Sequence, residues 1–166
     1  MNIYHGSDIV VKKPEILKSN RLLDFGIGFY TTSNLEQAIR WAQKVSSRNN
    51  TNKKFLSEYN FDIEKAKKEL KIIEFISADE KWLDFITANR RGKEISEDYD
   101  IVIGPVADDN VYLTVKLFEA GVLDKDEALR RLKVEKLFDQ ILFHTNKALA
   151  FCNFDHYQDL GGKGNG

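Results

Sequence analysis

The chain has 166 residues, of which 42% are hydrophobic and 31% charged, a composition typical of one globular domain with a sizeable core. Its 25 Lys and Arg residues nearly balance its 26 Asp and Glu residues, and the resulting net charge of −1 excludes a global basic field for holding nucleic acid. The single cysteine, Cys152, excludes an internal disulfide, and no run approaches the ~18 apolar residues of a membrane span. We expect a cytoplasmic protein without membrane association, folded over residues 1–157 and followed by a flexible glycine-rich tail at residues 158–166.

Strand and helix patterns follow one another through the first half of the chain. A short strand is expected at residues 2–5, and residues 24–32 end in a second strand after a bend at their glycines. Ser33 and Glu36 match a capping box and predict a helix to about residue 46, because apolar residues then recur at spacings of three and four. The next segments are a strand at residues 55–61, a short helix at residues 62–70 and a strand at residues 72–75.

The second half of the chain is richer in helix. Ser77 and Glu80 form another capping box, which predicts a helix ending near Gly92. Strands at both ends of the chain with helices between them predict an α+β fold, not the strict alternation of a doubly wound sheet. The remaining segments are a strand at residues 100–103, a helix capped by Asp108 or Asp109 and ended by Gly121, a helix from Asp124 to Leu132, and strands at residues 138–144 and 150–154.

Two common nucleotide-binding patterns are not present. Gly26 and Gly28 begin a G-x-G-x-x-G pattern, but Thr31 stands where the third glycine belongs and no acidic residue follows at the expected place. The phosphate-binding pattern G-x-x-x-x-G-K-[S/T] does not occur. The sequence therefore argues against a dinucleotide fold of the Rossmann type and against a P-loop.

Side chains for metal binding or nucleophilic catalysis are few. His144, Cys152 and His156, with Asp155 as a fourth ligand, follow no familiar zinc spacing, so we expect no metal site. Cys152 lies in an apolar strand, where a free cysteine usually packs as a small hydrophobe. We therefore expect Cys152 to be structural.

A more specific pattern is spread over the whole chain. His5-Gly6 ends the first strand, Gly28-Phe29-Tyr30 follows 25 residues later, and Gln140 lies in a strand near the C-terminus. This order resembles the ADP-ribosyltransferase superfamily, in the branch whose signature is His, Tyr and then Glu or a substitute such as Asp or Gln. One poorly characterised bacterial subfamily of single-domain proteins, often in toxin–antitoxin-like gene neighbourhoods, is similar in four segments: residues 4–7, 24–32, 104–109 and 139–145.

The resemblance implies an enzyme with a split β-sheet core and packed helices. Such an enzyme uses NAD as substrate, cleaves the nicotinamide–ribose bond and transfers ADP-ribose to an acceptor, here unidentified, that is a protein, a nucleic acid or a small molecule. It also implies that the protein is the toxin of a toxin–antitoxin pair, with a small antitoxin protein as partner. Asp108 and Asp109 then have two interpretations, helix capping and a catalytic or antitoxin-facing role.

The resemblance also implies a role for each matching residue. His5 would hydrogen-bond the 2′-hydroxyl of the adenine-side ribose, since a neutral imidazole offers one donor and one acceptor. Gly6 would present its backbone to the nicotinamide carboxamide, and Tyr30 would stack on the nicotinamide ring. Gln140 would face the 2′-hydroxyl of the nicotinamide-side ribose. Further candidates for the adenine and pyrophosphate contacts are Ser7, Gly28, Gly26 and Arg21.

Gln140 departs from the glutamate of the superfamily. A glutamine can orient the ribose, but it brings no negative charge to the developing cation and cannot act as a general base. The alternatives are therefore a catalytically weak or inactive module that binds NAD or a partner, and an NAD glycohydrolase with water as acceptor. Asp139 is not an easy replacement, because strand alternation directs it to the opposite face from Gln140.

Overall fold

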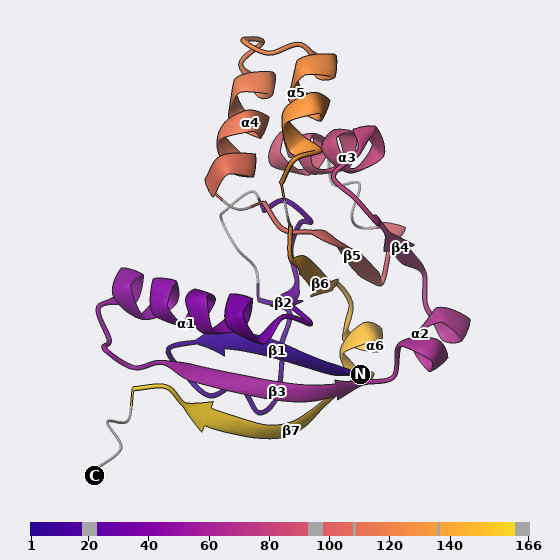
Figure 1. Ribbon diagram of the computed structural model, residues 1–166. Helices are drawn as coiled ribbons and strands as arrows, with labels where there is room; N and C mark the ends of the chain where they lie inside the picture. The colour runs from indigo at the N-terminus through magenta and orange to yellow at the C-terminus, as the bar shows by residue number, and fades with distance from the viewer. Residues whose placement is uncertain (18–22, 93–97, 108, 136, 162–166) are drawn as a thin grey trace.

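The computed structural model describes residues 1–17, 23–92, 98–107, 109–135 and 137–161. These ranges form seven strands and six helices arranged around two β-sheets (Figure 1). The predicted α+β class is confirmed. Arg21 and Asp108 lie outside the described ranges. No helix within those ranges is long and apolar enough to cross a membrane.

The first sheet is antiparallel and has three strands in the order β1-β3-β7. Helix α1 (Leu35–Asn49) packs against β1 so closely that a Cβ on Gly6 would overlap the carbonyl oxygen of Ala38 and lie 2.7 Å from the backbone nitrogen of Ala42. Gly6 is therefore required by the packing of a helix on a strand. The strands are β1 (Asn2–Ser7), β3 (Phe55–Phe61) and β7 (Cys152–Asp159).

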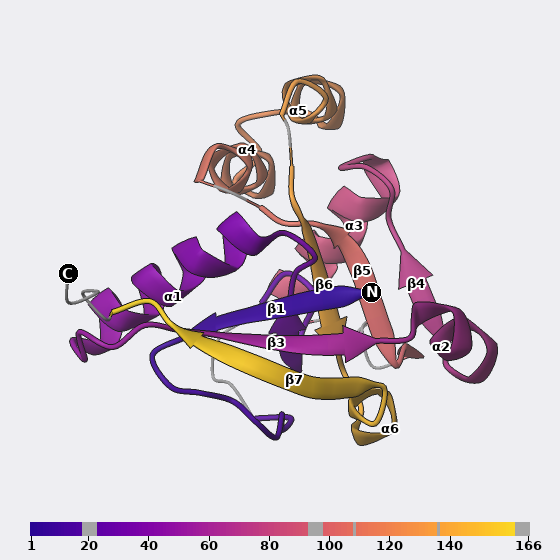
Figure 2. The same cartoon turned by 60° about the horizontal axis from the view of Figure 1, so that its bottom comes forward.

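The second sheet is mixed and has four strands in the order β2-β6-β5-β4, of which only the pair β4 and β5 is parallel. Figure 2 shows β5 and β6 crossing the strands of the first sheet at a steep angle, and Figure 1 shows three helices gathered beyond the second sheet. The strands are β2 (Phe29–Thr31), β4 (Ile72–Glu74), β5 (Ile101–Pro105) and β6 (Asp139–Phe143). The helices beyond it are α3 (Glu80–Arg90), α4 (Asp109–Glu119) and α5 (Lys125–Leu132), whereas α2 (Ile63–Glu69) and α6 (Asn146–Leu149) lie at the other end.

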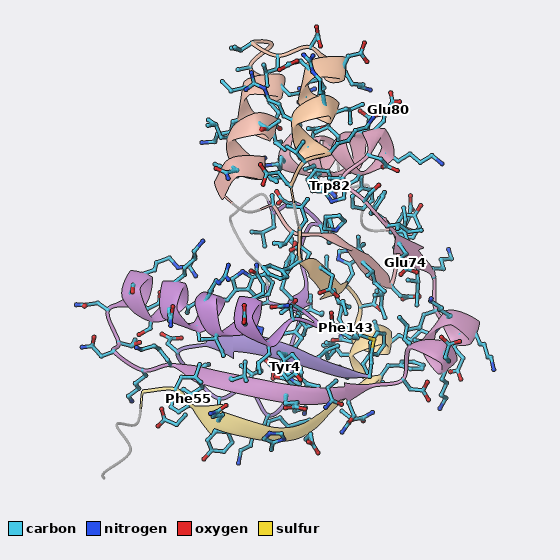
Figure 3. All side chains as sticks on the ribbon, in the orientation of Figure 1. Tyr4, Phe55, Glu74, Glu80, Trp82 and Phe143 are labelled. Carbon is cyan, nitrogen blue, oxygen red and sulfur yellow. The ribbon has the colours of Figure 1, made fainter. Side chains whose placement is uncertain are left out.

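Strand alternation in the second sheet divides the core in two. Ile141 and Phe143 of β6 face the first sheet, where the ring of Phe143 lies 5.1 Å from that of Phe61. Leu142 faces the three helices and shares its cluster with the fully buried Trp82 of α3. Figure 3 labels Phe143 and Trp82 in these two parts of the core. The even-numbered residues of β6, Gln140 among them, therefore belong to the face that carries α3, α4 and α5.

One backbone bridge joins the sheets beside β1 and β2. The amide of Tyr4 donates to the carbonyl of Thr32 at 2.8 Å, and the amide of Thr32 donates back to Tyr4 at 3.0 Å. Figure 3 labels Tyr4 on the first sheet. This bridge brings the middle of β1 next to the end of β2, although the two strands belong to different sheets.

Two predicted helix caps are wrong by one to two residues. Asn34, not Ser33, caps α1 by accepting the amide of Gln37 at 2.8 Å. Asp79, not Ser77, caps α3 by accepting the amide of Trp82 at 3.0 Å. The reason at α1 is tertiary, because the Ser33 hydroxyl donates to the carboxylate of Asp139 instead.

Two other helix-terminus predictions are confirmed. Asp124 caps α5 through the amide of Glu127 at 2.8 Å, and Gly121 follows α4 with a φ of 73° that favours glycine.

The last strand is longer than the sequence indicated. Its outer residues are polar and exposed, so they lack an alternating pattern, but backbone pairing with β3 continues to Asp159. The amide of Leu160 then donates to Lys54 at 2.8 Å. Residues 158–159, which the sequence assigned to a flexible tail, thus lie in β7.

Candidate functional site

A pocket of about 470 Å³ opens where β1, β2 and β6 meet helices α1, α3 and α4. It brings together four residues singled out in the sequence that lie up to 135 positions apart, namely His5, Gly6, Tyr30 and Gln140. We call it the β-junction pocket. Its other lining residues are Leu23, Asp24, Trp41, Lys44, Val45, Arg48, Arg90, Val106 and Tyr112.

His5 is held in one orientation by the neighbouring strand. Its Nδ1 lies 2.7 Å from the carbonyl oxygen of Tyr30. Because a carbonyl only accepts, Nδ1 carries the proton and Nε2 is the acceptor of the ring. Burial lowers the pKa of His5, and the ring of Phe29 lies 4.6 Å away. The imidazole is therefore a neutral, oriented group that offers an acceptor.

Tyr30 is fixed through its hydroxyl group. The hydroxyl donates to the carbonyl of Gly26 at 2.6 Å, and Gly26 has a φ of 90°, a conformation that side chains disfavour. Burial and the nearby carboxylate of Asp24 raise the pKa of Tyr30 far above its usual value. The phenol stays neutral, and its ring is presented to the pocket in a defined position.

Gln140 has an unsatisfied donor. The residue pairs with Gly104 across β5 and β6, and only 4% of it is exposed. Its Nε2 is buried and has no hydrogen-bond partner among the residues that the structure describes. An orphaned buried donor costs about 1–3 kcal/mol. The amide is thus suited to donate to a ligand in the β-junction pocket.

Asp139, unlike Gln140, has a structural role outside the pocket. Its carboxylate accepts hydrogen bonds from the Thr32 hydroxyl at 3.0 Å and from the Ser33 amide at 3.1 Å. These bonds fix the turn between β2 and α1, and Asp139 does not line the β-junction pocket.

Asp24, Arg90 and Tyr112 line one wall of the β-junction pocket and belong to an ion cluster whose fourth member, Glu119, lies outside the lining. Arg90 Nε lies 3.4 Å from Asp24 Oδ1, and Arg90 Nη1 lies 3.8 Å from Glu119 Oε2. The guanidinium group also lies 4.5 Å from the ring centroid of Tyr112. Burial raises the pKa of Asp24, and the positive charge of Arg90 acts against that shift.

Helix α1 forms the opposite wall with one of its faces. Trp41, Lys44, Val45 and Arg48 recur at helical spacing and all line the pocket. The sequence assigned no role to this face, because the apolar stripe at Leu35, Ala38, Ile39 and Ala42 dominates the periodicity. The signal that could have identified this face is a second stripe of aromatic and basic residues, Trp41, Lys44 and Arg48. Trp41 thus joins Tyr30 and Tyr112 as an aromatic residue of the pocket.

A second pocket adjoins the first. It has a volume of about 460 Å³ and shares His5 and Tyr30 with the β-junction pocket. Ser7 and Gly28 lie here, and not with Gln140. A Cβ on Gly28 would overlap Leu142, so the glycine is explained by packing on β6. Its remaining lining residues are Ile9, Val10, Val11, Lys12, Lys13, Glu15, Leu17 and Phe29.

Comparison with known proteins places the chain in a family. A family model described as "Protein of unknown function (DUF3990)" matches residues 1–154. The chain belongs to the DUF3990 family. Neither the search of curated proteins nor the search of solved structures gave a match for this DUF3990 chain.

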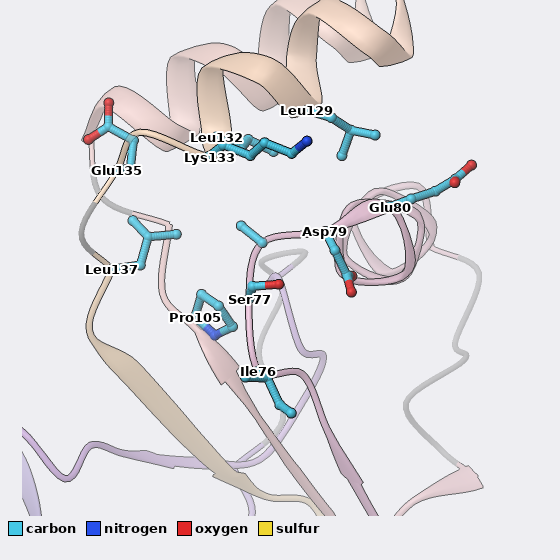
Figure 4. A pocket seen from close by; sticks show the side chains of 11 residues that line it. Ile76, Ser77, Asp79, Glu80, Pro105, Leu129, Leu132, Lys133, Glu135 and Leu137 are labelled. Atoms are coloured by element: carbon cyan, nitrogen blue, oxygen red, sulfur yellow. The ribbon is translucent and has the colours of Figure 1, made fainter.

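A third hollow in the DUF3990 chain, of about 410 Å³, lies between the start of α3 and α5 (Figure 4). Leu129 and Leu132 of α5 line it on one side, and Asp79 and Glu80 at the start of α3 line it on the other. The candidate site residues His5, Gly6, Tyr30 and Gln140 do not line it, and Glu80 is engaged with Lys125 at 3.0 Å. The β-junction pocket is therefore the stronger candidate site.

The sequence offered His144, Cys152 and His156, with Asp155, as possible metal ligands. In the described part of the DUF3990 chain, these residues do not form one group. The Nδ1 of His144 contacts the carbonyl of Ile27, and Cys152 is buried in the core, where burial raises its pKa to about 12. His156 is exposed and lies beside Asp155 at 2.8 Å and Glu58 at 3.4 Å.

Proposed function

We propose that this DUF3990 protein is an NAD-dependent ADP-ribosyltransferase, which cleaves the nicotinamide–ribose bond and transfers ADP-ribose to an acceptor. One observation carries the proposal. His5, Gly6, Tyr30 and Gln140 come from three strands of two sheets and line one pocket, in which the buried Nε2 of Gln140 lacks a partner. The junction of two sheets at this pocket supports the split-sheet core that the sequence resemblance implies.

The two adjoining pockets suit a ligand with two halves. Each volume lies within the ~300–1,000 Å³ typical of ligand sites, and His5 and Tyr30 line both. A dinucleotide has two nucleoside halves joined by a charged pyrophosphate. The β-junction pocket would take the nicotinamide riboside half, because it holds Gln140 together with Tyr30, Trp41 and Tyr112. Lys12 and Lys13 of the adjoining pocket provide positive charge near the pyrophosphate.

Several residues of the β-junction pocket can make contacts that the chemistry requires. Tyr30 and Trp41 offer flat faces to the nicotinamide ring. The Nε2 of His5 accepts, and the amide of Gln140 donates, hydrogen bonds with ribose hydroxyl groups. When the C1′–N bond breaks, its electron pair goes to the positively charged ring nitrogen, so nicotinamide leaves neutral and no general acid is needed. What the pocket must supply is stabilisation of the positive charge that develops on the ribose.

The test is release of nicotinamide from NAD, together with transfer of a label on the adenine half to a cell lysate. Trp41→Ala and Tyr30→Ala should each reduce release by about 10-fold or more, because each removes a stacking surface. Tyr157→Ala is the matched control, since this half-exposed aromatic residue of β7 lines neither pocket. Absence of release, or equal release by the wild type and both pocket variants, would contradict the proposal.

A second candidate function is an NAD-binding module without turnover. It is favoured by the amide of Gln140 at the position where the resemblance expects a carboxylate. NAD would then raise the melting temperature without any release of nicotinamide. Release with water as the only acceptor would instead identify a glycohydrolase.

A further inference from the structure

Asp24 is the only carboxylate among the described residues that line the β-junction pocket. We propose that Asp24 is the catalytic carboxylate of this site and supplies the negative charge that Gln140 lacks. This inference rests on the proposed function and adds a residue to it. It also removes the argument for an inactive module, because the pocket then contains an acid, contributed by the segment before β2 and not by β6.

The backbone of Asp24 is fixed on both sides. Asn89 Nδ2 of α3 donates to the carbonyl of Asp24 at 3.0 Å. The next residue, Phe25, is fully buried, and the Gly26 amide closes a turn onto Leu23 at 3.1 Å. The Tyr30 hydroxyl donates to this same turn at Gly26. Asp24 and Tyr30 are therefore positioned by one shared set of contacts, which a site that aligns a ring and a carboxylate requires.

The charge around Asp24 is balanced so that the carboxylate remains available. Arg90 is the cation paired with it, but Arg90 also faces Glu119, so one positive charge is shared by two carboxylates. The 3.4 Å separation from Arg90 Nε is longer than a close charge-assisted hydrogen bond of about 2.7–2.9 Å. Arg90 is thus a positioning residue that keeps Asp24 ionised without neutralising it fully. Burial raises the pKa of Asp24, which makes the carboxylate a stronger base than an exposed aspartate.

The chemical role follows from these contacts. As the C1′–N bond breaks and nicotinamide leaves with the electron pair, the Asp24 carboxylate stabilises the positive charge on the ribose. An acceptor O–H or N–H group then forms the new bond to C1′. Its proton passes to Asp24 and from there to solvent, which balances the reaction. Asp24 is accordingly both an electrostatic stabiliser and the general base.

The decisive variant is Asp24→Asn, which keeps the shape of the side chain and removes its charge. Nicotinamide release should fall by about 100-fold or more, whereas NAD should still raise the melting temperature. Glu119→Gln is the matched control, because its carboxylate contacts the same guanidinium and is similarly exposed, at 22% against 20% for Asp24, yet lies outside the pocket lining. Its release should stay within about threefold of the wild type, well below the loss expected at a catalytic group.

Rescue separates a catalytic carboxylate from a structural ion pair. In the Asp24→Asn background, Gln140→Glu should restore release by at least 10-fold, because it returns a carboxylate to the same pocket. If Asp24→Asn proves unstable, the double variant Asp24→Asn/Arg90→Gln removes both charges together. Its release should remain lost, and recovery to the wild-type rate would show that only the ion pair mattered and overturn the inference.

The outcomes distinguish the two proposals. Release by the wild type with full release by Asp24→Asn overturns the role of Asp24 and leaves the transferase proposal standing. Equal losses in Asp24→Asn and Glu119→Gln also overturn it, because the ion cluster as a whole would then be responsible. No release by the wild type overturns the proposed function and the role of Asp24 with it.

Discussion

The orphaned amide of Gln140 leads to a prediction in which stability and binding change in opposite directions. In Gln140→Met the side chain keeps a similar length, but the buried donor without a partner disappears. Removing such a donor recovers part of the ~1–3 kcal/mol that it costs. We therefore expect the free energy of unfolding to rise by about 1–2 kcal/mol. For a domain of this size that corresponds to about 2–4 °C in melting temperature per kcal/mol.

The same variant should lose its response to NAD. In the wild type a ligand that bonds to Nε2 satisfies the donor, so binding raises the melting temperature. In Gln140→Met the temperature shift at a fixed NAD concentration should shrink towards zero, although the protein alone is more stable. The assay is a pair of thermal melts, with and without NAD, for each protein.

A matched variant controls for the loss of any buried amide. Gln37 of α1 is also a buried glutamine, but none of its side-chain atoms is both buried and without a partner. Gln37→Met should therefore not raise the stability and should leave the NAD shift unchanged. A lower stability of Gln140→Met, or an undiminished NAD shift, would refute the reasoning from the orphaned donor.

Two further predictions concern the residues of β1. Gly6→Ala should destabilise the fold by about 1–3 kcal/mol in urea denaturation, because its Cβ would overlap α1; stability equal to the wild type would contradict this packing. Burial lowers the pKa of His5, so the folded state binds fewer protons than the unfolded chain, and stability should fall as the pH drops below ~6.5. In His5→Gln the free energy of unfolding, measured by denaturation curves at a series of pH values, should depend less on pH in that range. An unchanged slope would contradict the role assigned to His5. His156→Gln is the control with the opposite sign, because hydrogen bonding to Asp155 raises the pKa of His156, and its stabilisation is lost as the pH rises.

Local sequence patterns predicted the types of most elements, and their errors have identifiable causes. The predicted strand at residues 55–61 matches β3, since alternation is a strong signal when one face is buried. Ser33 failed as a cap because Asp139, which lies 106 positions away, binds its hydroxyl. The end of β7 failed because pairing with β3, and not side-chain burial, keeps it extended. Both errors come from partners that are distant in the sequence.

In the candidate site, too, local sequence patterns identified some residues and missed others whose position depends on distant parts of the chain. An ordered series of motifs singled out His5, Tyr30 and Gln140, and the structure brings them to one pocket; their roles in catalysis remain proposals. Asp24 lies within one of those motifs but received no role, because no local pattern shows that Arg90 of α3 lies beside it. Trp41 was obscured by the stronger apolar stripe on the same helix. Whether a residue lines a pocket depends on which helix and strand faces come together in the fold. Local periodicity does not predict which faces these are.

The strand order has a consequence for synthesis of the protein. β6 lies between β2 and β5 in the second sheet, yet it follows all the other strands of that sheet in the described part of the chain. A chain that ends before residue 139 lacks the strand that joins β2 to the rest of that sheet, and it also lacks Gln140. Incomplete translation products therefore cannot form the β-junction pocket. Any activity of the pocket begins only after β6 has left the ribosome.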